Sequence, residues 1–280
     1  VNNTWFKCNL GLVQILKQNE IKTILKIHNF RYECTRYLTS KGHLKGGDIC
    51  KMCGRTFKQY SILNKYFADS YLKSFAILRY GYKYIKVLKN YPIHIFVLNA
   101  FHKNYLVSLG ISEDKVSVSY NPINFDLEIP NKSNNQSNYI TYAGRISDEK
   151  GLSELLRTWT SSGIDKIKLK VVGDGSLLDS LRAEYKDTNI EFLGEKSQEE
   201  TQIIIKNSLA VVTATKMFEG QPRLLCEASS YGIPSIFPKF GGLQEYFPSD
   251  YSLSFQQYNY EDLKNKINLL GNKKVVNENG

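Results

Sequence analysis

The sequence contains no uninterrupted apolar run of the roughly 20 residues that a membrane-spanning helix needs. Its opening, VNNTWFKCNL, lacks an initiating methionine and the basic-then-apolar pattern of a secretory leader, so we expect the chain to be a fragment of a longer protein. Cysteine is scarce: the five are Cys8, Cys34, Cys50, Cys53 and Cys226. An odd number of cysteines without a leader argues against a disulfide framework and for a reducing, cytoplasmic compartment.

Acidic side chains are scarce in the first half of the chain. Residues 1–136 carry 20 Lys and Arg against 8 Asp and Glu, whereas the remaining residues carry 17 against 19. Residues 31–103 are the most uneven, with 14 basic and 3 acidic side chains interleaved with Tyr and Phe. This composition suits an anionic membrane surface or nucleic acid, although no nucleic-acid motif is present. A solvated face that only keeps the protein soluble is the plain alternative.

The length of 280 residues allows two domains of ordinary size. From Tyr139 onward, short apolar runs alternate with segments of helical periodicity. The predicted strands are 139–144, 168–175, 190–194, 209–215 and 233–238. The predicted helices begin near 152 and 177 and span 197–206, 222–231 and 260–270. Ser197 and Glu200 predict a capping box for the third of them. This alternation predicts a doubly wound parallel sheet, in which ligands bind at the carboxyl ends of strands.

The first half shows a less regular α/β pattern. Its predicted strands are 21–30, 94–100 and 115–123, and its predicted helices are 11–18, 61–89 and 104–109. Residues 31–58 predict a loop, and the polar segment 126–138 has the composition of an interdomain linker. We therefore predict an α/β protein with two Rossmann-like, doubly wound domains, residues 1–130 and 131–280, which face a cleft.

A first motif, AGRISDEKG, occupies residues 143–151, between a predicted strand and a predicted helix. Gly144 would let the backbone approach a ligand closely, and Arg145 and Lys150 could both reach one anionic group. The start of the helix at Gly151 adds backbone N–H donors and a favourable dipole. Together these groups would hold a diphosphate and stabilise it as it leaves. A loop with solvated charges is the plain alternative.

A second motif, FEGQPRLLCEA, follows the predicted strand 209–215 and places seven residues between Glu219 and Glu227. Glu219 and Gly220 fall in the loop and Glu227 falls on the helix, where they would face a sugar or a phosphate. A carboxylate suits paired sugar hydroxyls because each of its oxygens accepts hydrogen bonds. The plain alternative is one loop glutamate and one glutamate on the face of a helix.

A third motif, VVGDG, ends the predicted strand 168–175 with Gly173 and Gly175. These glycines permit a tight turn against a ligand, although a turn that serves only the fold is the commoner outcome. The order of the three motifs, each directly after a strand, is more specific than any one of them.

Two further features carry less information. Cys34, Cys50 and Cys53, with His43 between them, could supply the four ligands of a zinc site, or could be ordinary loop cysteines or redox-labile thiols. His28 ends an apolar strand, where a buried, hydrogen-bonded histidine is commoner than a catalytic one.

The motifs resemble those of glycosyltransferase family 4 over nearly the whole chain. GRISDEKG resembles G-R-x-x-x-x-K-G, and FEGQPRLLCEASSYGIPSI followed by GGLQEYF resembles E-G-x-x-x-x-x-x-E-A with the trailing G-x-P and G-G-x-x-E elements. IHNFRYEC and GGDICKMC resemble a subset with H-N-x-R-x-x-C and C-x-x-C, and SYNPI resembles the strand-end N-x-I/V. Arg223 departs from the pattern, because an aliphatic residue is frequent there. This arginine could add a phosphate contact or only cover the start of the helix. Against the family pattern, we also expect the start of the first domain and the final crossover helix of the second to be missing.

The resemblance implies a GT-B fold and transfer of a sugar from a nucleotide donor, a UDP- or GDP-sugar, with retention at the anomeric carbon and without a required cofactor or metal. It implies that Arg145 and Lys150 neutralise the donor diphosphate and that Glu227 binds the ribose hydroxyls. It places Glu219 at the donor sugar and His28 near the reacting centre, as the two catalytic residues. The other donor-binding residues that it implies are Gly144, Gly173, Gly220, Gln221 and Pro222.

We therefore expect a retaining glycosyltransferase that acts on a polysaccharide, lipopolysaccharide or lipid-linked acceptor. Residues 31–103 would contact the inner face of an anionic membrane, and no nucleic-acid partner is expected. A GT-B sugar-nucleotide epimerase would share the fold and the nucleotide site. A basic module that binds nucleic acid or membrane is a third interpretation.

Overall fold

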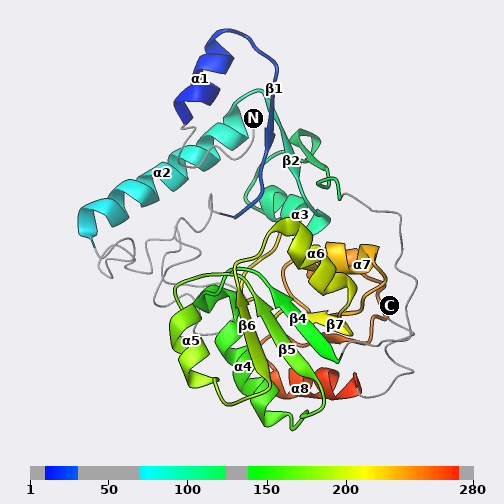
Figure 1. The fold of residues 1–280 in the computed structure, drawn as a ribbon. Coiled ribbons are helices and arrows are strands. Elements are labelled where there is room, and N and C mark those ends of the chain that lie inside the picture. Colours follow the sequence, from blue (N-terminus) through cyan, green and yellow to red (C-terminus); the bar gives the residue numbers. More distant parts are fainter. Residues whose placement is uncertain (1–9, 31–69, 124–137, 271–280) are drawn as a thin grey trace. The chain divides into compact units, whose positions relative to one another are not determined.

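The computed structural model describes residues 10–30, 70–123 and 138–270, which belong to two compact units (Figure 1). The first unit comprises Val1–Asn121 and the short segment Met217–Gln221, and the second comprises Pro122–Lys216 and Pro222–Gly280. The domain boundary predicted between residues 130 and 131 lies outside the described residues. Among the helices of the described ranges, none combines the length and the apolar character that crossing a membrane requires.

The first unit contains a three-stranded parallel sheet in the order β1-β2-β3. In chain order its elements are α1 (Leu10–Gln18), β1 (Thr23–Lys26), α2 (Tyr71–Asn90), β2 (Ile93–Val97), α3 (Ala100–Ser108), the 3-10 helix η2 (Glu113–Lys115) and β3 (Val116–Val118). Alternate residues of β2, Ile93, Ile95 and Val97, are buried, because successive side chains of a strand point to opposite faces. They share one core with Leu88 of α2 and Leu106 of α3.

Several boundaries in this unit differ from those predicted. The strands expected at 21–30 and 115–123 are shorter, Thr23–Lys26 and Val116–Val118, and the junction before α3 is displaced. The strand expected at 94–100 ends at Val97, and the helix expected at 104–109 begins at Ala100, so both predictions are wrong at this junction. The cause is Asn99, whose side-chain oxygen accepts a hydrogen bond from the backbone N–H of His102 at 2.8 Å and so caps α3. Apolar residues on both sides of the cap concealed it in the sequence.

The second unit contains a six-stranded parallel sheet in the order β6-β5-β4-β7-β8-β9, which is the order of a doubly wound sheet. In chain order its elements are β4 (Tyr139–Ala143), η3 (Asp148–Lys150), α4 (Leu152–Ser161), β5 (Lys168–Val172), α5 (Leu178–Glu184), β6 (Ile190–Gly194), α6 (Gln198–Lys206), β7 (Ala210–Val212), α7 (Arg223–Ser230), β8 (Ser235–Pro238), η4 (Leu243–Tyr246), β9 (Ser254–Phe255) and α8 (Tyr260–Leu269). The predicted capping box of α6 is present, since Ser197 and Glu200 each accept a hydrogen bond from the other's backbone N–H. Strand β9 was not predicted, because two residues are too few to show a period.

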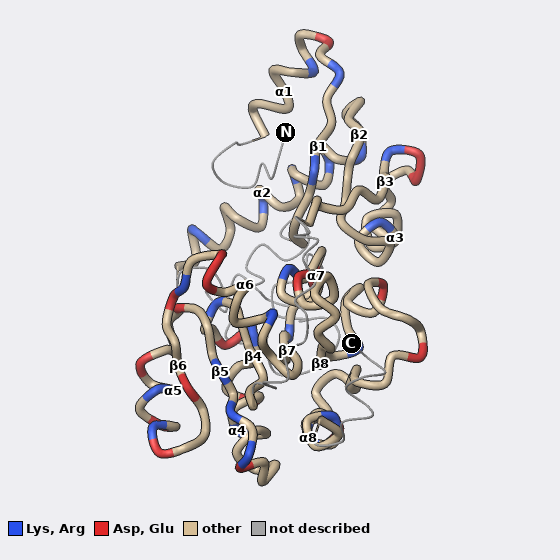
Figure 2. The backbone as a smooth tube through the Cα atoms, turned by 45° about the vertical axis from the view of Figure 1, so that its right-hand side comes forward, with Lys and Arg blue, Asp and Glu red and all other residues tan. Residues whose placement is uncertain are grey.

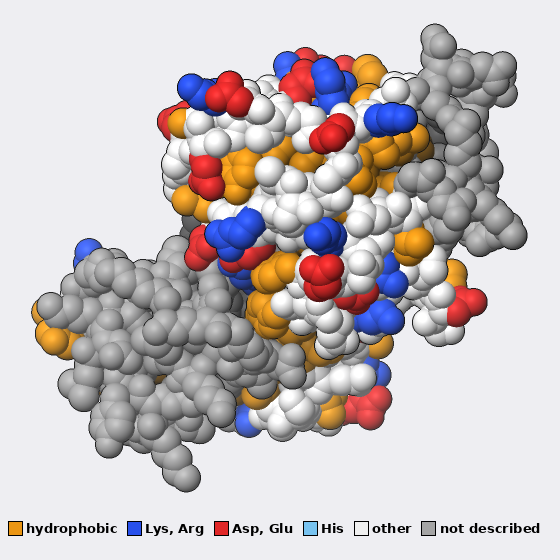
Figure 3. Space-filling view, turned by 90° about the horizontal axis from the view of Figure 1, so that it is seen from below, with side chains coloured by type: hydrophobic (Ala, Val, Ile, Leu, Met, Phe, Trp, Pro, Cys, Tyr) orange, Lys and Arg blue, Asp and Glu red, His pale blue; other side chains and the backbone are white. Residues whose placement is uncertain are grey.

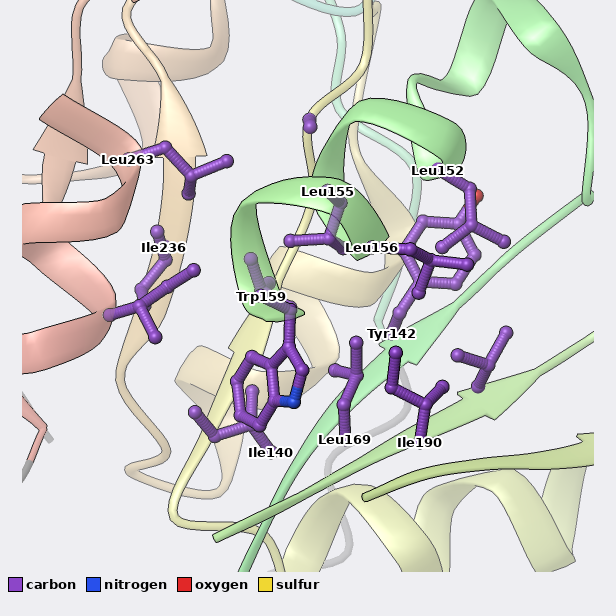
Figure 4. Close-up of a cluster of buried hydrophobic side chains, with 14 of the residues drawn as sticks. Ile140, Tyr142, Leu152, Leu155, Leu156, Trp159, Leu169, Ile190, Ile236 and Leu263 are labelled. Carbon is purple, nitrogen blue, oxygen red and sulfur yellow. The ribbon is translucent and has the colours of Figure 1, made fainter. Parts of the chain in front are cut away.

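The two faces of this sheet bury separate apolar cores. In β7, Ala210 and Val212 belong to the core that includes side chains of α4, α5 and α8, whereas Val211 belongs to the core with α6 and α7. Burial on both faces explains why this stretch of the sequence is continuously apolar. Figure 4 shows the first core, in which Trp159 of α4 points toward the sheet, and its indole N–H donates to the side-chain oxygen of Asn189 at 2.9 Å.

Charges are distributed differently on different parts of the surface. On the face shown in Figure 3, basic and acidic side chains lie side by side among the described residues. Helix α2 carries only basic charges along its length (Figure 2), and these are Lys73, Arg79, Lys83, Lys86 and Lys89.

Candidate functional site

The strand order of the second unit reverses at one place. From β4 the chain continues to β5 and β6 on one side, and it then returns to β7 on the opposite side of β4. In doubly wound sheets, ligands bind beyond the carboxyl ends of the strands at such a switch point. The loops that begin there span residues 144–151 and 213–222. The first holds most of the first motif, and the second holds the start of the second motif, which continues into α7.

The loop after β4 is held against the VVGDG turn by backbone contacts. The N–H of Ile146 donates to the carbonyl of Asp174 at 2.8 Å, and the N–H of Gly144 donates to that of Val172 at 3.0 Å. A Cβ atom at Gly173 would lie 2.0 Å from the carbonyl oxygen of Gly144, and one at Gly175 would lie 2.1 Å from that of Ile146. The glycines of the third motif are therefore explained by this close approach of backbones, and the role of Gly173 toward a donor stays a prediction.

Unlike Gly173 and Gly175, Gly144 is not required by a close backbone contact. A Cβ atom at this position would meet nothing closer than the hydroxyl oxygen of Tyr142, at 3.5 Å, which is an ordinary contact distance. Packing against the described residues therefore does not require glycine at position 144. A glycine at this position lets a ligand approach the backbone more closely than any side chain would allow.

Arg145, the second residue of this loop, is half exposed. Its Nε lies 3.4 Å from Oε1 of Glu149, and the hydroxyl of Ser147 donates to the same oxygen at 2.7 Å. The side chain of Glu149 is 6% exposed, so a buried carboxylate restrains a cation that reaches solvent. Lys150 follows in η3, and Gly151 then starts α4 without a side-chain cap, which leaves backbone donors of the helix available.

The two loops are joined to each other by a buried cation and a close contact. The Nζ atom of Lys216 lies 2.6 Å from Oε1 of Glu154 and 3.4 Å from Oδ1 of Asp148, and its side chain is 4% exposed. The backbone N–H of Lys216 donates to the carbonyl of Glu149 at 3.0 Å. Gly151 has φ 69°, and a Cβ atom on it would lie 1.9 Å from the carbonyl oxygen of Ala214. The start of α4 is thereby fixed against the end of β7.

Glu227 lies in the second turn of α7 and is mostly buried. Its Oε1 atom accepts a hydrogen bond from Nε of Arg223, four residues earlier, at 2.7 Å. Pro222 precedes this helix as its N-cap and provides no side-chain hydrogen bond. The residue that departs from the family pattern thus contacts a predicted site residue directly.

The other predicted residues lie in the first unit. Asn99 is fully buried, and its side-chain N–H groups donate to the carbonyls of Glu219 at 3.0 Å and Gly220 at 2.6 Å. A Cβ atom at Gly220 would lie 2.9 Å from the side chain of Leu98 and 3.4 Å from the carbonyl oxygen of His28. Within this unit the structure therefore brings His28 close to the Glu219–Gly220 backbone.

Aromatic rings anchor the same segment. The ring of Phe218 lies 5.3 Å from that of Phe30, 5.0 Å from that of Phe101 and 6.0 Å from that of Tyr105, measured between centroids. At its other end, the side-chain oxygen of Gln221 accepts from the N–H of Asn121 at 2.6 Å, and its side-chain N–H donates to the carbonyl of Asn121 at 3.1 Å. The segment Met217–Gln221 is thus held at both ends and in the middle.

Two histidines of the first unit have a lowered pKa. Burial, with a smaller contribution from Lys26, lowers the pKa of His28 below its usual value, so this imidazole is neutral at pH 7. Burial lowers the pKa of His102 to about 3, and its ring stacks on Phe30 with centroids 4.1 Å apart. A neutral imidazole at His28 can accept a proton or a hydrogen bond at its unprotonated ring nitrogen.

The candidate zinc ligands Cys34, His43, Cys50 and Cys53 lie outside the described residues. Within the described ranges, no group of three or more His, Cys, Asp or Glu side chains could hold a metal ion. Cys226 is buried and forms no disulfide with another described residue.

Sequence reasoning missed Asn99 and Lys216. The signal for Asn99 was an asparagine directly before a helix, the usual N-cap residue type. Lys216 had no local signal, since its partners Asp148 and Glu154 are more than 60 residues away in the chain.

Comparison with known proteins gives a family and a set of relatives. The family model described as glycosyl transferases group 1 matches residues 125–279. The lipopolysaccharide 1,6-galactosyltransferase of Salmonella typhimurium (strain LT2) is 31% identical over 150 residues, which cover 48% of this chain and 39% of the relative. The amylovoran biosynthesis glycosyltransferase AmsD of Erwinia amylovora is 26% identical over 147 residues, 51% of this chain and 42% of the relative. The matched part of the chain thus spans about two fifths of the length of these curated relatives.

Solved structures resemble the chain over nearly its whole length. HepE of Anabaena, solved in complex with UDP, has a TM-score of 0.66 at 13% identity, covering 96% of this chain and 68% of that one. The lipopolysaccharide outer core galactosyltransferase WaaB has a TM-score of 0.59 at 18% identity, covering 95% and 70%. At these identities the likeness concerns the fold, and it confirms the predicted α/β class with Rossmann-like parallel sheets of the GT-B type.

Proposed function

The chain belongs to the glycosyl transferases group 1 family, and on that premise we propose that it is a retaining glycosyltransferase, which moves a sugar from a nucleotide-sugar donor to a glycan acceptor. The observation that carries the proposal is the loop after β4 at the switch point of the second unit. There the open Gly144, the half-exposed Arg145 and the uncapped start of α4 supply a positive, hydrogen-bonding surface for a diphosphate.

Each predicted residue has a role in the proposed reaction. Arg145 and Lys150 neutralise the diphosphate, and Glu227 accepts hydrogen bonds from the ribose hydroxyls. Glu219 contacts the donor sugar, and His28 lies near the reacting centre. The residues that present their backbone to the donor are Gly144, Gly173, Gly220, Gln221 and Pro222. Asn99 fixes the Glu219–Gly220 backbone through its two hydrogen bonds.

The proposed chemistry retains the configuration of the anomeric carbon. The acceptor hydroxyl oxygen forms a bond to that carbon on the face from which the diphosphate departs. The bond between the carbon and the diphosphate oxygen breaks, and the hydroxyl proton passes to the leaving diphosphate. Arg145 and Lys150 stabilise the negative charge that develops on the leaving group.

The substrates are proposed from the relatives. HepE was solved with UDP and with UDP-glucose, which supports a UDP-sugar as the donor. The curated relatives are named for lipopolysaccharide and amylovoran synthesis, which supports a cell-surface glycan or its lipid-linked precursor as the acceptor. Work on such an acceptor would take place at the cytoplasmic face of a membrane.

Helix α2 supports peripheral contact with an anionic membrane. Besides its five basic residues it exposes Tyr71, Leu72 and Phe75, the last two at 82% and 53%. Apolar side chains that enter the interface and cations that meet lipid phosphates together favour such contact. The test is cosedimentation with vesicles of phosphatidylcholine alone or with phosphatidylglycerol. Binding to the anionic vesicles should be weaker for the double variant Leu72→Ser/Phe75→Ser than for the unaltered protein. Equal binding of the unaltered protein to both vesicle types would contradict the proposed membrane contact.

Thermal melting against UDP-, GDP-, ADP- and CMP-sugars tests the proposed donor site. A ligand that binds only the folded protein raises the midpoint, and at a hundredfold excess over Kd the rise should be about 5 °C. One class of nucleotide should give this rise, and Arg145→Ala should abolish it. The matched control is Arg182→Ala on α5, an exposed arginine outside both loops, which should keep the rise. No rise with any donor would overturn the proposal.

Turnover distinguishes the transferase from the other interpretations. A transferase consumes the donor only when a glycan acceptor is present, whereas an epimerase converts the donor alone. A binding module without catalysis would do neither, and its binding would be unaffected by Glu219→Ala.

A further inference from the structure

Arg223 lies at the first position of α7 and forms an ion pair with Glu227, with 2.7 Å between Nε and Oε1. The side chain of Glu227 is 12% exposed and that of Arg223 is 66% exposed. A mostly buried carboxylate needs a hydrogen-bond partner, and here the partner is an arginine whose own side chain is largely exposed. This pair is the feature of the second unit that the family motif does not contain.

We propose that Arg223 is a positioning residue, which fixes the carboxylate of Glu227 for the ribose hydroxyls of the donor and thereby determines how tightly the nucleotide binds. This inference rests on the proposed function, in which Glu227 receives those hydroxyls. Among the described residues, Oε1 of Glu227 accepts the bond from Arg223 and no hydrogen bond to Oε2 is found, so none of these residues competes with a ligand for Oε2. A carboxylate held at one oxygen presents the other in a single orientation.

Helix stability does not explain why an arginine stands at this position. A cation in the first turn of a helix is opposed by the helix dipole, and the first turn of α7 contains no acidic residue that would offset it. The order of the pair, with the basic residue four positions before the acidic one, is also the less favourable order for a helix. The arrangement is therefore better explained by what the arginine does to Glu227.

An alternative role for Arg223 is direct contact with a phosphate of the donor. The two roles make different predictions, because positioning of Glu227 affects the ribose whereas direct contact affects the diphosphate. The conservative variant also separates them. Lysine keeps the charge that a phosphate needs but lacks the planar, rigid group that holds a carboxylate in one orientation.

The experiment is isothermal titration of the full chain with UDP and GDP, and with the 2′,3′-dideoxy form of whichever of them binds. In Arg223→Met we expect affinity for the ribonucleotide to fall about fivefold, since a charge-assisted hydrogen bond is lost at a partly exposed site. Affinity for the dideoxy form should change less than twofold, because it has no hydroxyls for Glu227. Arg223→Lys should resemble Arg223→Met, and the control Arg182→Met should match the unaltered protein. Melting without ligand verifies that each variant is folded.

Equal losses for the ribonucleotide and the dideoxy form, with recovery in Arg223→Lys, would show a phosphate contact and overturn the inference. Unchanged affinity in Arg223→Met would overturn it too, while the proposed function would stand because the unaltered protein still binds nucleotide. Failure of the unaltered protein to bind either diphosphate would overturn the proposed function, and the inference with it.

Discussion

The loops after β4 and β7 flank the same switch point but are held in place by different means. The loop after β4 is shaped by backbone contacts, and Gly151, Gly173 and Gly175 are the positions where any Cβ atom would meet a carbonyl group. The loop after β7 is shaped by side chains, namely the buried Lys216 and Asn99 and the partly buried ring of Phe218. A loop of the first kind leaves a glycine pattern in its own sequence, whereas a loop of the second kind depends on residues far away in the chain.

The largest expected effect concerns the backbone-shaped loop. Gly151→Ala should lower the free energy of unfolding by more than about 3 kcal/mol, because its Cβ atom would lie 1.9 Å from a carbonyl oxygen and its φ is positive. Gly163→Ala is the matched control. Its φ of 72° is similar, but no atom lies within 4 Å of the added Cβ, so it should cost only about 1 kcal/mol. Urea unfolding measures both, and equal losses would show that the close contact with Ala214 is relieved cheaply.

The next largest effect concerns the side-chain-held loop. Lys216→Met should cost about 2 kcal/mol, because it leaves Glu154 without its cation. The value is below that for a fully buried pair, since Asp148 is 62% exposed and solvent screens it. Lys196→Met removes an exposed ion pair with Glu200 and should cost less than about 0.5 kcal/mol. A similar small loss for Lys216→Met would mean that the buried cation does not hold the loop.

Lowering the pH from 7 to 5 should reduce the stability of the first unit, which contains His28 and His102. The loop after β4 contains no histidine, so this cause of acid sensitivity does not apply to it. The folded pKa of His102, about 3, lies below its unfolded value of about 6.5, so the unfolded chain binds the extra proton between these values. Stability is therefore complete above pH 6.5 and falls as the pH is lowered toward 3, and His28 contributes in the same direction. Between pH 7 and 5 the loss should be about 2 kcal/mol. His102→Phe should reduce it in denaturant unfolding at the two pH values, and an unchanged pH dependence would contradict the assignment.

The same contrast explains what could be predicted from the sequence. The elements of the second unit follow from local patterns, because each strand is an apolar run and each helix has a periodic face. The capping box at Ser197 and the glycine-lined loops are equally local. The strand-to-helix junction at Asn99 was misplaced because apolar residues continue on both sides of it. The pairing of Lys216 with Glu154 was not predictable, since it depends on which strands become neighbours in the sheet.

The candidate site divides in the same way. Arg145, Lys150 and Glu227 could be named from motif spacing alone, but the contact between Arg223 and Glu227 required the helix to be in place. The sequence left two roles open for Arg223, a phosphate contact or a cover for the helix start. The structure adds a third possibility, which is the ion pair between Arg223 and Glu227.

The smallest expected effect concerns the side-chain amide of Asn99, which caps α3 and also holds the Glu219–Gly220 backbone. Asn99→Ser retains an oxygen that can cap α3, but one short hydroxyl cannot replace both N–H groups that donate to the carbonyls of Glu219 and Gly220, so at least one of these hydrogen bonds is lost. We expect a loss of about 1 kcal/mol. Asn259→Ser is the matched control, because the Asn259 side chain caps α8 through the N–H of Asp262 and makes no second hydrogen bond among the described residues. Serine and asparagine are nearly equivalent as caps, so this control should change stability by less than about 0.3 kcal/mol. If both variants cost the same in urea unfolding, the cap alone explains Asn99, and the segment Met217–Gln221 is held by Phe218 and Gln221 without it.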